Sequence, residues 1–129
     1  MTHKALENAE LALGQLVAFL SEPVTSDRDR AGVVQAFEFT FEATWKLLKH
    51  VAEHEGLSAE SPRRALTAAH KLGLVRNETL WLEMLQDRNL TSHVYHHQIA
   101  ARIFAAIRAH YVDALVETVD LARAVLTRG

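Results

Sequence analysis

The sequence predicts an all-α protein, an antiparallel bundle of four or five helices. Apolar residues recur at the three- and four-residue spacing of amphipathic helices, and no stretch shows the apolar–polar alternation of a strand. The five glycines and two prolines fall mostly between these helical patterns. A length of 129 residues, with 49% hydrophobic and 23% charged residues, is typical of one globular domain. We therefore expect a single domain over residues 1–129.

Two helices are predicted on either side of a break at Glu22-Pro23. The first runs from about His3 to Leu20, with apolar positions at Leu6, Ala9, Leu13, Leu16 and Val17. The second begins at a capping arrangement of Ser26 with Asp29 and stops at Gly56. Its large apolar side chains cannot all face one small core: Phe37, Phe39, Phe41 and Trp45. We expect part of this helix to be buried against a partner, most simply in a homodimer.

Three further helices follow. A hydroxyl cap and a proline, Ser61-Pro62, predict a helix that ends at Gly73. Asn77 can cap the next helix, which ends near Arg88-Asn89. The last and longest helix is predicted from about His97 to Leu126, with apolar residues at Ile99, Ile103, Ile107, Tyr111, Leu115, Val119, Ala122 and Leu126.

Charge is unevenly distributed along the chain, whose net charge is −2. Residues 1–56 carry five Lys/Arg against nine Asp/Glu, whereas residues 57–110 carry seven against four and hold five of the eight histidines. This favours one anion-binding site over the broad basic surface that coats nucleic acid. The sequence has no cysteine, no apolar run of membrane-spanning length and no N-terminal leader, so we expect a cytoplasmic protein with no membrane partner.

One segment carries residue types suited to phosphodiester chemistry, Arg88-Asn89-Leu90-Thr91-Ser92-His93-Val94-Tyr95. Arginine binds phosphate oxygens in pairs, histidine takes and gives a proton near neutrality, and tyrosine has a hydroxyl that can be modified. Arg88 continues an apolar stripe, so it marks either the end of a helix or a cleft in the bundle: Leu80, Trp81, Met84 and Leu85. On a continuous helix His93 would point about 140° away from Arg88, whereas a bend would let the two side chains converge.

Together with the run from Gln35 to Lys46, the segment from Asp87 to Tyr95 resembles the nucleotidyltransferase substrate-binding subunits of the HEPN superfamily, in particular the HepT group. The resemblance covers nearly the whole chain. It implies a homodimeric HEPN-like bundle that pairs with a minimal nucleotidyltransferase antitoxin in a type VII toxin–antitoxin system. HepT-group toxins cut RNA without a metal, and the partner neutralises them by attaching AMP to the motif tyrosine. The resemblance therefore implies that Arg88 and His93 are catalytic, that Asn89 supports them and that Tyr95 is the AMP acceptor.

These roles are chemically coherent. His93 can take the proton of a ribose 2′-hydroxyl, and Arg88 can stabilise charge on the phosphorane that forms. A symmetric dimer could supply an acid and a base from two copies of the motif. We expect an RNA substrate, no DNA, no cofactor and no metal. A non-catalytic substrate-binding subunit of a two-component nucleotidyltransferase is the alternative, because the same family has also been interpreted in that way.

Other polar residues leave alternatives open. His93, His96 and His97 have the spacing of metal ligands, but no carboxylate lies among them. Glu38, Glu42 and Lys46 form a helical row, either a salt-bridged stripe or a set in which Glu42 positions site groups. The hydroxyls of Thr91 and Ser92 are expected to cap rather than to attack. A basic set is either a solvated face or an extension of the anion site: Arg63, Arg64, Lys71 and Arg76. The chain has no glycine-rich phosphate loop and no paired-aspartate nucleotidyltransferase signature.

Overall fold

The computed structural model describes residues 3–93 and 96–128, and every regular element in these ranges is helical. The elements are α1 (Lys4–Leu20), α2 (Asp27–His54), α3 (Pro62–Lys71), α4 (Glu78–Asn89), the 3₁₀ turn η1 (Thr91–His93), α5 (His97–Ala106), the π-helical turn η2 (Ile107–Tyr111) and α6 (Val112–Leu126). This confirms the predicted all-α helical bundle. None of the described helices is both long and apolar enough to span a bilayer.

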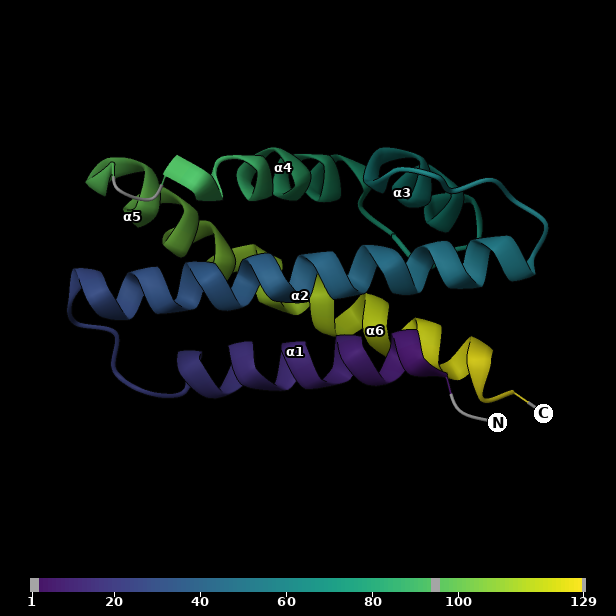
Figure 1. The fold of residues 1–129 in the computed structure, drawn as a ribbon, viewed down its shortest axis with the longest axis horizontal. Helices are drawn as coiled ribbons and strands as arrows, with labels where there is room; N and C mark the ends of the chain where they lie inside the picture. The colour runs from purple at the N-terminus through teal and green to yellow at the C-terminus, as the bar shows by residue number, and fades with distance from the viewer. Residues whose placement is uncertain (1–2, 94–95, 129) are drawn as a thin grey trace.

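α2 is the central helix of the bundle (Figure 1). α1 lies antiparallel along one side of it, α3 and α4 lie along the other, and the α5–η2–α6 rod crosses behind it. Fully buried rings join these layers. Phe37 of α2 stacks on Tyr111 of η2 at 5.6 Å between ring centroids, and Phe41 packs against Trp81 of α4 at 6.1 Å. The core therefore fixes α4 and η2 against the same stretch of α2.

The helix boundaries follow their local signals. Ser26 and Asp29 form the predicted capping box, since the Ser26 hydroxyl accepts from the Asp29 N–H and the Asp29 carboxylate accepts from the Ser26 N–H. Asn77 caps α4 by accepting from the Leu80 N–H at 3.0 Å. Gly56 and Gly73 end α2 and α3 at a φ of +79°, a conformation that other residues adopt only with strain.

The excess of large apolar groups on α2 is partly resolved within the chain. Phe37 and Phe41 are buried in the core, whereas Phe39 is 54% exposed and points away from it. Val17 also differs from its predicted core position, because it is exposed on α1. The outward-facing Phe39 is what the sequence led us to expect, and the partner that would cover it stays a prediction.

The last helix is a single rod that contains a π turn which the sequence analysis did not predict. Its core residues are spaced by four, and each four-residue step on an α-helix rotates about 40° beyond a full turn. From Ile103 to Val119 the drift would reach about 160°, enough to carry the stripe to the opposite face. The wider η2 turn absorbs one residue and keeps the stripe on the core side, with every member buried: Ile103, Ile107, Tyr111, Leu115 and Val119.

Candidate anion site at the junction of α4, η1 and α2

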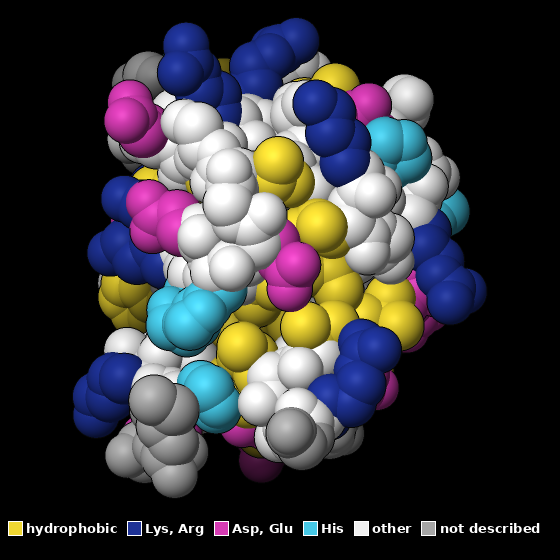
Figure 2. Space-filling model, turned by 90° about the vertical axis from the view of Figure 1, so that its right-hand side faces the viewer, with side chains coloured by type: hydrophobic (Ala, Val, Ile, Leu, Met, Phe, Trp, Pro, Cys, Tyr) yellow, Lys and Arg dark blue, Asp and Glu magenta, His cyan; other side chains and the backbone are white. Residues whose placement is uncertain are grey.

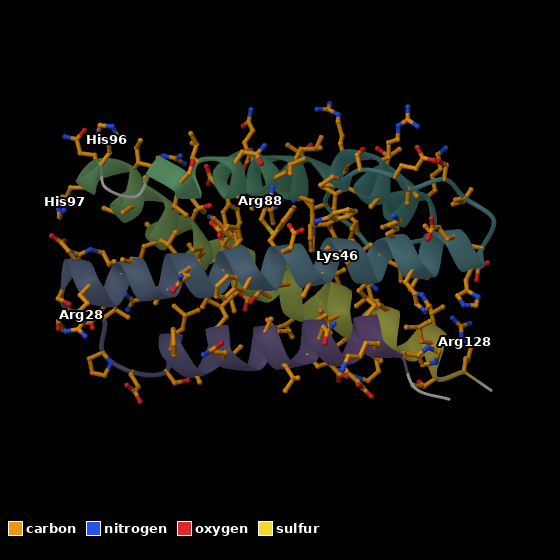
Figure 3. The ribbon with its side chains drawn as sticks, viewed as in Figure 1. Arg28, Lys46, Arg88, His96, His97 and Arg128 are labelled. Carbon is orange, nitrogen blue, oxygen red and sulfur yellow. The ribbon has the colours of Figure 1, made fainter. Side chains whose placement is uncertain are left out.

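Arg88 lies on the last turn of α4 where that helix faces α2 (Figure 3). Its side chain is 30% exposed, and its guanidinium forms an ion pair with the Glu42 carboxylate of α2. Arg88 Nη1 also lies 3.3 Å from Asn89 Oδ1, so the predicted supporting residue contacts the predicted catalytic arginine. Arg88 is therefore a cation that is fixed in direction yet accessible to solvent.

Glu42 is the carboxylate that fixes this cation. It accepts a hydrogen bond from Trp45 Nε1 at 3.1 Å and lies 3.5 Å from Lys46 Nζ. Burial raises the pKa of Glu42, but the Trp45 hydrogen bond and the positive charges of Arg88 and Lys46 outweigh burial, so that the pKa falls below its ordinary value. Glu42 is ionised at neutral pH, and its contact with Arg88 supports the interpretation in which it positions site groups.

Thr91 is the second anchor between this segment and α2. Its buried hydroxyl contacts the Glu38 carboxylate and lies 2.7 Å from the Arg88 carbonyl oxygen. A hydroxyl has a single hydrogen, so it donates to one of these acceptors at a time. Thr91 thus joins the end of α4 to α2, in keeping with a capping role and not with a nucleophile.

The predicted bend after Arg88 is present. α4 ends at Asn89, and the chain turns through η1 from Thr91 to His93. The side chain of His93 and all of Tyr95 lie outside the described residues, so the predicted convergence of Arg88 with His93 and Tyr95 stays a prediction.

Asp87 lies next to Arg88 on α4, and no role was predicted for it from the sequence. It is only 5% exposed, and its carboxylate accepts from Arg102 Nη2 at 2.9 Å, from Arg102 Nη1 at 3.3 Å and from the Tyr111 hydroxyl at 2.6 Å. Hydrogen bonding to Asp87 raises the pKa of Arg102, while burial and then the bond to Asp87 raise the pKa of Tyr111. The sequence did indicate that Asp87 faces the core, because Asp87 follows Trp81 and Met84 at helical spacing, and all three are buried.

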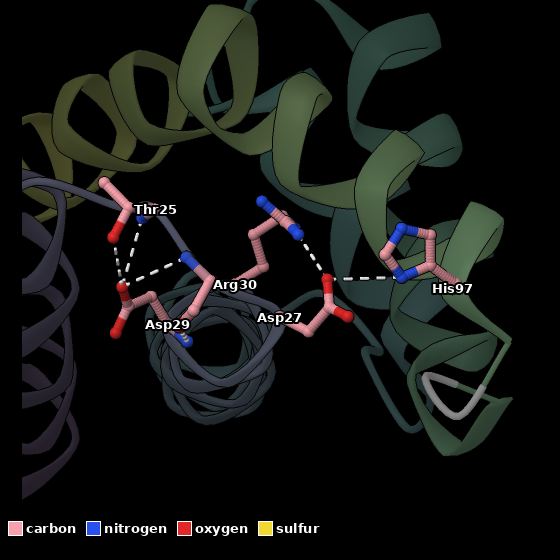
Figure 4. A network of polar contacts seen from close by, with 6 residues as sticks. Thr25, Asp27, Asp29, Arg30 and His97 are labelled. Atoms are coloured by element: carbon pink, nitrogen blue, oxygen red, sulfur yellow. Dashed lines mark hydrogen bonds and ion pairs between the residues drawn. The ribbon is translucent and has the colours of Figure 1, made fainter.

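No group of three His, Asp or Glu side chains among the described residues is arranged to hold a metal, and the side chain of His93 lies outside the described part of the chain. His97 instead lies with its Nδ1 3.2 Å from the Asp27 carboxylate, beside the capping box of α2 (Figure 4). Asp27 also pairs with Arg30. His97 therefore links the start of α5 to the start of α2.

A second histidine cluster lies at the end of the bundle where α1 begins and α6 ends (Figure 2). The ring centroids of His3 and His50 are 6.0 Å apart, and those of His50 and His54 are 5.0 Å apart. Burial, followed by the neighbouring charges of His54 and His3, lowers the pKa of His50. Val125 and Leu126 of α6 line the same pocket as these three histidines, so the cluster borders the end of the core.

The basic residues of α3 and of the loop after it behave as a solvated face. Arg63, Arg64, Lys71 and Arg76 are exposed, and Arg76 lies 3.9 Å from Glu117. They belong to the α3 end of the bundle, whereas Arg88 belongs to the far end of α4.

An all-helical bundle in which a carboxylate of the central helix orients an accessible arginine of α4 is suited to binding an anion. Comparison with known protein families gives the assignment. Residues 2–122 match the model described as "Nucleotidyltransferase substrate binding protein like", and the chain belongs to this family.

Individual relatives agree with this assignment. A Haemophilus influenzae protein named "Probable ribonuclease HepT" is 27% identical over 89 residues, which cover 65% of this chain and 61% of the relative. The chain thus spans about three fifths of that relative's length. The predicted resemblance to HepT and to nucleotidyltransferase substrate-binding proteins is confirmed at the level of the family.

Two solved structures share the fold. A Thermus thermophilus protein superposes with a TM-score of 0.82 and 35% identity, over 89% of this chain and 98% of its own. A Haemophilus influenzae protein superposes with a TM-score of 0.75 and 25% identity, over 93% of this chain and 98% of its own. The latter structure is described as revealing "the fold of a substrate binding domain of a nucleotidyltransferase".

Proposed function

We propose that this protein is a HepT-like toxin, a ribonuclease that cuts RNA without a metal and is neutralised when a partner minimal nucleotidyltransferase attaches AMP to Tyr95. The observation that carries the proposal is Arg88, a partly exposed cation held by Glu42 at the point where α4 ends and the chain turns into η1. The relative named as a probable ribonuclease supports the same activity.

The reaction follows from the residue types. Neutral imidazole of His93 takes the proton of the ribose 2′-hydroxyl, and the 2′-oxygen attacks the adjacent phosphorus. The bond from phosphorus to the 5′-oxygen then breaks, the 5′-oxygen takes a proton from an imidazolium, and a 2′,3′-cyclic phosphate remains. Arg88 donates hydrogen bonds to the non-bridging oxygens, where negative charge increases in the transition state. In the proposed homodimer, the second imidazole comes from the other copy of the motif.

The Arg88–Glu42 pair is compatible with this role. A guanidinium has five N–H donors in a planar fork, so one edge can stay on Glu42 while another binds phosphate. The carboxylate also sets the plane of the guanidinium before the substrate arrives, and preorganised donors contribute more to catalysis than donors that must turn.

Cleavage in the presence of EDTA tests the activity. We expect the wild type to cut RNA in EDTA and to leave cyclic phosphate ends, and we expect His93→Ala and Arg88→Ala each to lose about 100-fold or more of the rate. His97→Ala is the matched control, because His97 is an exposed histidine paired with Asp27, and it should cut at the wild-type rate. Loss of activity on chelation, restored by a divalent ion, would contradict the metal-free mechanism.

Intact mass after incubation with ATP, magnesium and the partner nucleotidyltransferase tests the control step. Wild-type protein should gain one or more AMP groups and lose nuclease activity, because the added phosphodiester places negative charge beside Arg88. Tyr95→Phe should stay active and unlabelled. Peptide mapping separates Tyr95 from Tyr111, the other tyrosine, whose hydroxyl is buried against Asp87. Equal labelling of the wild type and Tyr95→Phe would exclude Tyr95 as the acceptor.

The second candidate function is a non-catalytic substrate-binding subunit of a two-component nucleotidyltransferase. The family description and the Haemophilus influenzae structure favour it. The same experiment discriminates between the two functions. A chain that stays unlabelled, cuts no RNA and raises the partner's turnover on another molecule has the second function.

A further inference from the structure

Asp87 and Arg88 are neighbours in sequence but face different parts of the bundle. Arg88 and Thr91 contact α2, whereas the Asp87 carboxylate contacts Arg102 of α5 and Tyr111 of η2. Consecutive residues on a helix point about 100° apart, so these contacts hold the last turn of α4 from two sides. A turn held from two sides cannot rotate about the helix axis without breaking one set of contacts.

The π turn is what brings both Asp87 partners to one place. Arg102 and Tyr111 are nine residues apart, and on an uninterrupted α-helix they would point about 180° apart. The η2 turn accommodates one extra residue and so removes about 100° of this difference. Both side chains then reach the same buried carboxylate. The irregular turn therefore has a specific structural consequence at the end of α4.

Rotation of the last turn of α4 would displace the guanidinium of Arg88. Side-chain tips lie about 5–6 Å from the axis of a helix, so that a rotation of about 10° moves a tip by roughly 1 Å. Displacements of that size at a reacting group can cost on the order of 100-fold in rate. Loss of the Asp87 contacts would therefore allow a displacement of the Arg88 guanidinium large enough to slow the reaction.

We infer that Asp87 is a positioning residue, and that its contacts with Arg102 and Tyr111 hold the last turn of α4 so that Arg88 faces the scissile phosphate. This inference rests on the proposed function and adds a residue to it that the Arg–His–Tyr motif does not contain. Asp87 itself touches no substrate, because its side chain is buried against the α5–η2 rod.

Tyr111→Phe is the variant that tests the inference most cleanly. It removes one hydrogen bond to Asp87 and keeps the aromatic ring that stacks on Phe37. We expect kcat for RNA cleavage to fall about 10- to 100-fold with KM unchanged within about twofold, since the loss concerns transition-state contacts of Arg88. Asp87→Asn should reduce kcat at least as much.

Thr118→Val is the matched control. Thr118 lies on α6, and its buried hydroxyl donates to the Leu74 carbonyl oxygen at 2.8 Å, away from Arg88. Each substitution thus removes one buried hydroxyl bond from the same rod, and we expect similar losses in thermal stability. Only Tyr111→Phe should reduce kcat. Equal reductions in both variants, or wild-type kcat in Tyr111→Phe, would overturn the inference.

Amide hydrogen exchange gives a readout that is independent of nuclease activity. The amides of residues 88–92 should exchange faster in Tyr111→Phe than in Thr118→Val, because only the former releases the end of α4. Unchanged exchange in this segment would overturn the inference even in an active enzyme. Faster exchange in a protein whose wild type cuts no RNA would reject the proposed ribonuclease while supporting the role of Asp87 in holding α4.

Discussion

The residue that determines the character of the site is a carboxylate. Glu42 carries the charge that orients Arg88, and it is itself held by the Trp45 N–H and the Lys46 ammonium. Both members of the Arg88–Glu42 pair are partly exposed, so the pair contributes direction more than stability. Trp45 donates a hydrogen bond to Glu42, and this contact with the pair explains why a large aromatic residue of α2 is not wholly in the core.

Glu42→Gln should destabilise the protein modestly at neutral pH. The amide keeps an acceptor for Trp45 but loses the charge that faces Arg88, and we expect a loss of about 0.5–1 kcal/mol, or about 2–5 °C in Tm. Glu53→Gln is the control, since Glu53 is an exposed glutamate on the same helix. Thermal unfolding at pH 7 measures both variants, and equal Tm values would contradict a structural role for the pair.

The same pair predicts a pH dependence with a definite sign. The pKa of Glu42 is lowered in the folded state relative to its ordinary value of 4.5, so folding is favoured by the ionised form. The stabilisation is complete above pH 4.5 and is lost as the pH falls below that value through the folded-state pKa. The Tm difference between the wild type and Glu42→Gln should therefore shrink as the pH is lowered from 7 toward 3. A difference that persists at low pH would show that the charge is not its cause.

At the scale of elements, the sequence predicted what local chemistry determines. The caps at Ser26, Ser61 and Asn77 and the stops at Gly56 and Gly73 depend on neighbouring residues only, and the structure has them where they were predicted. The π turn depends on how a long stripe accumulates rotation against a distant core, so no local signal marks it. Repeated four-residue spacing was the only sign of it in the sequence.

Deletion of Ala109 tests this account of the π turn. Removing one residue from η2 leaves core spacings of four, three, four and four from Ile103 onward, which suits an uninterrupted α-helix. We expect the deletion variant to keep its helical content and to unfold cooperatively. Circular dichroism with thermal unfolding measures both properties.

Deletion of Gln35 from α2 is the control for that experiment. α2 contains no wide turn that could absorb the loss, so every residue beyond position 35 must rotate by about 100° relative to the start of the helix. Phe37 and Phe41 would then leave the core, and the variant should not fold. If both deletions have the same effect on stability, the π turn does not accommodate the extra residue in the way described above.

At the scale of the whole molecule, exposed apolar groups mark the side of the bundle formed by α1 and α2. Leu11 is 75% exposed and Phe39 is 54% exposed. Phe39 borders a shallow pocket of about 440 Å³ that Glu42 and Lys46 also line, so this apolar surface adjoins the Arg88–Glu42 pair. A two-fold assembly through this region would bring two copies of the Arg88–Glu42 pair toward one another.

We therefore expect a homodimer of about 29 kDa, twice the chain mass of 14.5 kDa. Phe39→Lys should shift the protein to the monomer, because a solvated ammonium replaces an apolar ring at the interface. Phe19→Lys is the matched control, because Phe19 is another exposed phenylalanine that lies beside Pro23 and Val24 at the end of α1 and does not line the pocket that Phe39 borders. Light scattering at micromolar concentration reports the mass of each. A monomeric wild type, or a dimer that survives Phe39→Lys, would contradict an interface at this surface.

The site was predictable in part and for a physical reason. Arg88 was recognisable as a candidate because a charge followed an apolar helical stripe, whereas Asn89 was a candidate only through the resemblance to the HepT group. Asp87 was not given a role, because its partners Arg102 and Tyr111 converge only through tertiary packing and the π turn. The structure has features of both interpretations of the helical row that includes Glu42, since Glu42 pairs with Lys46 within the row and with Arg88 of α4 outside it.

His3 packs against His50 in a pocket that Val125 and Leu126 also line, so the start of α1 lies close to the end of α6. This arrangement has a practical consequence for attaching the protein to a label or a support. The start of α1 and the end of α6 lie at one end of the bundle, while η1 and the start of α5 lie toward the other (Figure 1). A tag, a fluorescent label or a surface anchor attached at either terminus would stand clear of Arg88. Immobilised protein should accordingly present the α4–η1 junction to a passing RNA strand, whichever terminus holds it to the support.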